Sequence, residues 1–105
     1  MLHELRTANI LRQDEWPGDE NTDTAFRALE VAGEAGELAE AVKKYLRAEK
    51  AIAGKIGKLE DIADEMGDVI ISIDLLANHL GIDLEAAVRC KFNKTSAKYD
   101  FETVL

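Results

Sequence analysis

Two pairs of acidic residues share one spacing within otherwise apolar helical patterns. Each pair has a second acid three residues after the first, and the four residues are Glu34, Glu37, Glu65 and Asp68. At about 100° per residue, the members of a pair lie about 60° apart on a helix and share one face. That face also carries apolar side chains, such as Leu38 and Val69. The spacing therefore predicts carboxylates on helix faces that are typical of a core.

Carboxylates in such a position indicate a metal ion. Burying a carboxylate costs free energy unless it is protonated, paired or bound to a metal, and clustered acids also repel one another. Oxygen ligands select a hard cation, Mg²⁺ first, with Mn²⁺ or Ca²⁺ behind it. Zinc and di-iron fit poorly, because neither His3 nor His79 lies three or four residues from these acids. The alternative is that both pairs are solvated surface charges.

Four helices are expected to position these acids. The helical period of the apolar residues, together with the residues that start and end helices, predicts them at about Leu2–Gln13, Thr24–Lys50, Lys58–Leu80 and Leu84–Tyr99. The acidic stretch 14–23, broken by Pro17 and Gly18, is expected to be a loop. Because short connections join helices of opposite direction, we expect an all-α fold: an antiparallel helical bundle of about four helices, completed by oligomerisation.

Composition limits the classes of protein and partner. A chain of 105 residues makes one small domain, which buries a modest share of its surface, so a homo-oligomer is expected. The net charge of −8 disfavours binding to a nucleic acid polymer or to an anionic membrane. No apolar run approaches the ~20 residues of a membrane span, and the N-terminus is not typical of a secretory signal. With its single cysteine, the chain is expected to be cytoplasmic.

Three segments closely resemble the MazG-like nucleotide pyrophosphohydrolases, of the all-α NTP pyrophosphatase superfamily. They are LEVAGEAGELAEAVKK, DIADEMGDVIISIDLLANHLGI and AAVRCKFNKTSAKYDF, and the match runs from about residue 26 to 101. The resemblance implies a single MazG-like domain over residues 1–105. It also implies Mg²⁺-dependent hydrolysis of a (deoxy)nucleoside triphosphate between the α and β phosphates, giving the monophosphate and pyrophosphate. The four acids match the family's E-x-x-E and E-x-x-D metal ligands, and members usually form dimers or tetramers.

The same resemblance assigns substrate contacts to the fourth helix. The family's K-F-N signature is matched at Lys91 and Asn93, and Lys98 falls where relatives contact the triphosphate. Many relatives have a second basic residue and then glycine after that lysine, whereas this chain has Tyr99 and Asp100. Glu37 is the candidate for helping to deprotonate the attacking water, although spacing does not separate it from the other three acids.

Two further functions remain open from the sequence. The same acids could serve a non-catalytic nucleotide- or metal-binding regulatory module, or they could be surface charges of a structural helical protein. Trp16 and Tyr45 could stack on a nucleobase or pack against the helices.

Overall fold

A computed structural model describes all 105 residues of the chain. It contains four α-helices, one short 3-10 helix and no strand, which confirms the all-α class. The elements are α1 (Leu2–Glu15), η1 (Asp19–Asn21), α2 (Thr24–Lys50), α3 (Leu59–His79) and α4 (Leu84–Lys98). The sequence predicts a loop over residues 14–23, but less of this segment is irregular. Helix α1 continues to Glu15, directly before Trp16 and Pro17, and η1 forms beyond them.

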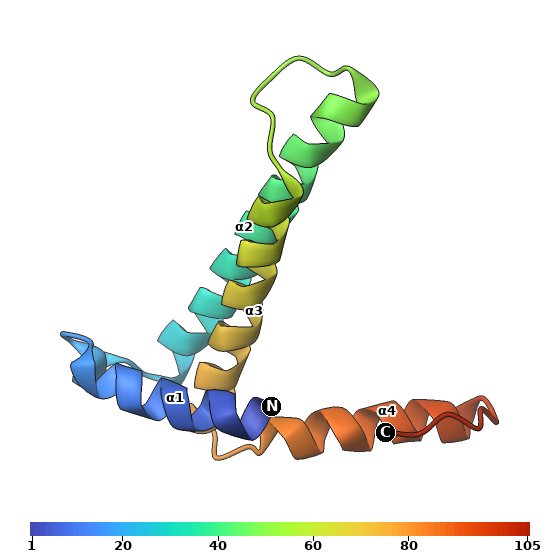
Figure 1. Cartoon of the computed structure of the whole chain (residues 1–105). Helices are drawn as coiled ribbons and strands as arrows, with labels where there is room; N and C mark the ends of the chain where they lie inside the picture. The colour runs from blue at the N-terminus through green and yellow to red at the C-terminus, as the bar shows by residue number, and fades with distance from the viewer.

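The longest helices, α2 and α3, pack side by side as an antiparallel hairpin (Figure 1). Asp23 caps the start of α2, where its side chain accepts a hydrogen bond of 2.8 Å from the Phe26 amide. At the other end, Ala51 adopts the left-handed conformation that ends many helices (φ 51°). The connection that follows returns the chain to α3, and Arg47 holds it by donating to the Lys55 carbonyl oxygen.

Helix α1 lies across the base of this hairpin and is fixed there by one buried carboxylate (Figure 1). Asp74 of α3 is completely buried, and it accepts hydrogen bonds from Arg6 Nε at 3.1 Å and Asn9 Nδ2 at 2.9 Å. Arg6 also donates to the Ile82 carbonyl oxygen, in the turn after α3. Because its hydrogen bonds satisfy the buried charge, the network determines where α1 docks.

Helix α4 projects away from the hairpin (Figure 1). Gly81, with φ 69°, turns the chain after α3, and Asp83 caps α4 by accepting from the Ala86 amide. Beyond α4, the last residues fold back along the helix, where the Leu105 backbone pairs with the Asn93 side chain.

The single chain is more open than a closed bundle. Its radius of gyration is 17.0 Å, whereas a compact chain of this length has about 13 Å. Only nine of 105 residues are buried, and large apolar side chains such as Leu29 (70% exposed) face outward. Antiparallel packing is thus present in the α2–α3 pair, but the four helices do not enclose one core within a chain. None of the helices combines the length and apolar composition needed to cross a membrane.

Candidate metal centre

The hairpin brings the two acidic pairs face to face. Glu34 and Glu37 lie on α2, while Glu65 and Asp68 lie on α3. Carboxylate oxygens of Glu34, Glu37 and Glu65 all lie within 4.8 Å of one another. Asp68 is outside this closest group and lines a cavity together with Glu34. The antiparallel register of the hairpin therefore assembles residues that are about thirty positions apart in the chain.

Two oxygens in this group are buried without a partner. Glu34 Oε2 and Glu65 Oε2 are inaccessible to solvent and accept no hydrogen bond, although both residues are only half-buried overall. Glu37 and Asp68 are exposed. Buried polar atoms in proteins almost always have a partner, and those that lack one often mark the place of an ion or a reactive group. The pair of unpartnered oxygens thus favours a cation between α2 and α3.

The electrostatics of these carboxylates also favours a bound cation. Burial raises the pKa of Glu34 above its ordinary value, and the nearby carboxylates of Glu37 and Asp68 raise it further. The pKa of Glu65 is raised by the same causes in the same order. A bound divalent cation would offset this repulsion and favour the ionised forms.

The donor set fits a hard cation. The group offers carboxylate oxygens only, with no imidazole or thiolate. Such oxygens suit Mg²⁺, Mn²⁺ and Ca²⁺, whereas a zinc site usually contains His or Cys. The three clustered glutamates, with Asp68 beside them, are therefore the residues that would hold the ion.

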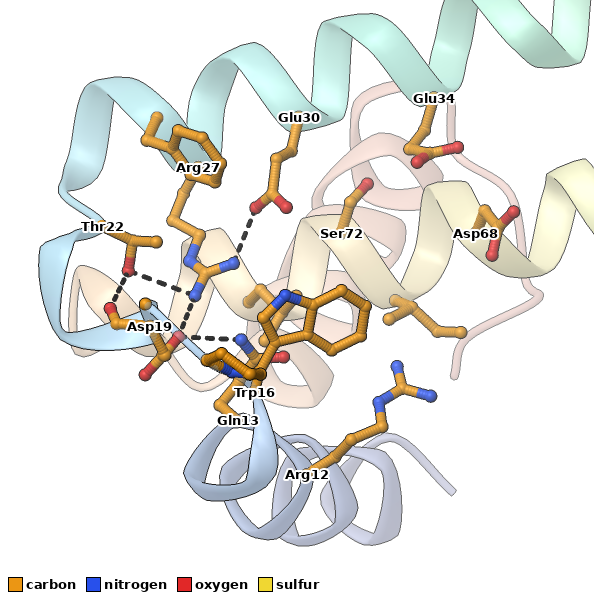
Figure 2. A pocket seen from close by; sticks show the side chains of 15 residues that line it. Arg12, Gln13, Trp16, Asp19, Thr22, Arg27, Glu30, Glu34, Asp68 and Ser72 are labelled. Atoms are coloured by element: carbon orange, nitrogen blue, oxygen red, sulfur yellow. Dashed lines mark hydrogen bonds and ion pairs between the residues drawn. The ribbon is translucent and has the colours of Figure 1, made fainter.

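A cavity of about 340 Å³ adjoins Glu34 and Asp68 (Figure 2). It lies between the end of α1, the turn after it, and the facing sides of α2 and α3. Arg27 is buried in its wall and donates to Glu30 at 2.7 Å, to Asp19 and to Thr22 Oγ1. This network, which sequence reasoning missed, ties the turn to α2. In the sequence, neither the position of Arg27 in the helical pattern nor the composition of its segment distinguishes it from a surface arginine.

The three candidate substrate contacts lie elsewhere within one chain. Lys91 lines a separate groove on α4 with Phe92 and Phe101. The Asn93 amide pairs with the backbone of Leu105, at 3.2 and 2.7 Å, and Lys98 lies over the ring of Tyr99. The structure therefore brings together the acids but does not bring α4 to them.

Fold and site together define an all-α protein with a carboxylate centre on an antiparallel helix pair. Residues 24–100 match the family of the MazG nucleotide pyrophosphohydrolase domain, and the chain belongs to that family. It is 30% identical over 89 residues to the gene 37 protein of Mycobacterium phage L5, covering 81% of this chain and 77% of that protein. It is 32% identical over 71 residues to the uncharacterized protein YvdC of Bacillus subtilis (strain 168), covering 64% and 67%. No solved structure gives a significant match.

Proposed function

We propose that this chain is a Mg²⁺-dependent pyrophosphohydrolase that cleaves (deoxy)nucleoside triphosphates between the α and β phosphates, releasing the monophosphate and pyrophosphate. Mn²⁺ could replace Mg²⁺, since it has similar ligand preferences. The observation that carries the proposal is the pair of buried, unpartnered oxygens of Glu34 and Glu65 beside Glu37. Membership of the MazG family supports the reaction class.

Each acid has a part in this proposal. Glu34 and Glu65 would anchor the ion from opposite helices, and Glu37 and Asp68 would complete its ligands from the exposed edge. When bound, a divalent cation offsets the charge that develops on phosphate oxygens and makes water more acidic. Glu37 is exposed beside both anchoring residues, so it can accept a proton from the attacking water and release it to solvent.

Basic and amide groups from α4 would bind the triphosphate. Lys91, Asn93 and Lys98 match the family's positions, but α4 projects away from the acids of its own chain (Figure 1). We propose that they act in a homo-oligomer, where α4 of one subunit approaches the acids of another. The open shape of the single chain and its exposed apolar side chains support this assembly.

Incubation with a panel of ribo- and deoxyribonucleoside triphosphates and Mg²⁺ tests the reaction, with products resolved by chromatography. Monophosphate and pyrophosphate in equal amounts are expected. Diphosphate and orthophosphate would contradict the assigned bond, and binding without turnover would favour the regulatory module. The Glu40→Gln variant serves as a control, because Glu40 is an exposed acid of α2 paired with Lys43.

A further inference from the structure

The cavity beside the acids is larger than a metal ion requires. Its volume of about 340 Å³ is near the lower end of pockets that hold small organic ligands, which span about 300–1,000 Å³. Glu34 and Asp68 form part of its lining, while aromatic and aliphatic side chains form another part: Trp16, Phe26, Ile71 and Leu75. Such a lining suits a ligand that has a planar, apolar part and another part that reaches the acids of the metal site.

Trp16 offers an available aromatic surface in this lining. Its side chain leaves the turn between α1 and α2, and 60% of the residue is exposed. Figure 2 shows the indole ring of Trp16 extending from the turn among the side chains that line the cavity. An aromatic surface of this kind stacks on any nucleobase, because every base has a π face.

Arg12 is the uncommitted cation of the cavity. The other lining arginine, Arg27, is occupied by Asp19, Glu30 and Thr22, whereas Arg12 forms no hydrogen bond or ion pair. Its guanidinium extends from α1 on the side of the cavity where Asp68 lies (Figure 2). In a chain of net charge −8, a free guanidinium near the acid cluster suits an anionic ligand, since it can form two parallel hydrogen bonds to a phosphate.

The wall that carries these groups is held in place before a ligand arrives. Asp19 accepts hydrogen bonds from Gln13 Nε2 at 2.8 Å and from the buried Arg27, so the turn that presents Trp16 is tied to both α1 and α2. Fewer groups then have to be ordered on binding, which preserves affinity.

We propose that this cavity binds the nucleoside end of the substrate, with Trp16 stacked on the base and Arg12 paired with the phosphate nearest the sugar. The proposal rests on the proposed function, because the triphosphate would then extend from Arg12 over the carboxylates. It assigns substrate recognition to α1 and the turn after it, in addition to α4.

Tryptophan fluorescence tests the stacking directly, because Trp16 is the single tryptophan of the chain. The probes are an uncleavable α,β-methylene deoxynucleoside triphosphate and inorganic triphosphate, each with Mg²⁺. The nucleotide is expected to quench the emission in a saturable manner, whereas inorganic triphosphate leaves it nearly unchanged. Equal responses to both probes, or no response to bound nucleotide, would overturn the stacking.

Variants separate the two roles. Trp16→Ala is expected to raise KM for nucleotides about tenfold or more, with Trp16→Phe close to wild type and the affinity for inorganic triphosphate unchanged. Arg12→Ala should weaken binding of both probes, and Arg12→Lys should restore part of it. Lys50→Ala, which removes an exposed positive charge at the far end of α2, is the matched control.

The outcomes distinguish this inference from the proposed function. If wild type cleaves nucleoside triphosphates but Trp16→Ala and Arg12→Ala keep the wild-type KM, the cavity is not the nucleoside site. If wild type shows the specific quench but no cleavage, the nucleoside site stands and the proposed reaction fails. Should Trp16→Ala fail to fold, the wild-type quench and the Arg12→Ala variant still decide the matter.

Discussion

At the scale of single residues, the hairpin holds two glutamate oxygens in a position that is unfavourable without a cation. Glu34 Oε2 and Glu65 Oε2 have no partner, and the pKa of each residue is raised by burial and by neighbouring acids. Burial and repulsion together make this arrangement costly for the metal-free chain. Such a cost is typical of functional sites, where the fold holds groups ready for a ligand.

Loss of a single ligand from this centre should affect catalysis more than folding. Glu37→Gln or Asp68→Asn is expected to lower turnover by at least about 100-fold, because both remove a carboxylate from the ion. In the presence of a chelator, thermal unfolding should show a Tm equal to or above that of wild type, since repulsion among the acids is reduced. Glu40→Gln is the control for the loss of one negative charge. Unchanged turnover in both site variants would refute the ligand assignment.

The stability of the metal-free chain should depend on pH through Glu34 and Glu65. A carboxyl group whose pKa is raised on folding stabilises the folded state while protonated, and this contribution is lost as pH rises through the folded-state pKa. We therefore expect the metal-free Tm to fall as pH rises above 4.5, the ordinary value. Asp83 and Glu85 act in the opposite direction and at lower pH, because their pKa values are lowered.

Comparison with the Glu34→Gln/Glu65→Gln double variant isolates this contribution. The variant should show a smaller fall in Tm over the same pH range, measured by circular dichroism in the presence of a chelator. Parallel curves for wild type and variant would show that these carboxyls are solvated.

At the scale of elements, α1 depends on one buried carboxylate. Asp74→Ala would leave Asn9 buried without its partner and would remove the ion pair with Arg6. The free energy of unfolding is expected to fall by about 2–4 kcal/mol, because breaking a buried network leaves unpaired groups inside the protein. Urea unfolding measures this change. Asn78→Ala, an exposed substitution on the same helix, should cost much less.

The helices and the acid cluster could be predicted from the sequence, but the surroundings of the cluster could not. Helical period places Glu34 and Glu65 on apolar faces, and antiparallel pairing of consecutive helices makes those faces meet. Trp16 lies beyond the end of α1, where periodicity no longer constrains side-chain direction, and the position of Arg12 relative to the acids depends on how α1 docks on the hairpin. The left-handed conformation of Gly81 (φ 69°) is expected for a glycine just after a helix, but the direction of α4 depends on the whole connection between α3 and α4 and could not be predicted.

At the scale of the whole molecule, the chain exposes many large apolar side chains, which supports the proposed homo-oligomer. Light scattering at micromolar concentration should therefore give the mass of a dimer or tetramer. A monomer with full activity would contradict this expectation.

The proposed sharing of sites between subunits has a sharper test. Lys91→Ala should weaken nucleotide affinity by about 2 kcal/mol while leaving Mg²⁺ binding to the substrate-free protein nearly unchanged. If α4 serves the acids of another subunit, mixing Lys91→Ala with inactive Glu37→Gln under conditions of subunit exchange should restore activity. Mixtures that stay at the sum of the separate activities would place Lys91 in its own subunit's site or outside any site.

Titration calorimetry of the substrate-free protein with Mg²⁺ and Mn²⁺ measures whether the oxygens of Glu34 and Glu65 are held for a divalent cation. Wild type and Glu40→Gln should bind the metal saturably, with a matching rise in Tm, as expected when an ion binds the folded state. The Glu34→Gln/Glu65→Gln variant should lose both the heat and the rise in Tm while keeping its helical circular dichroism spectrum. Undiminished metal binding by that variant would show that the oxygens of Glu34 and Glu65 do not hold the cation.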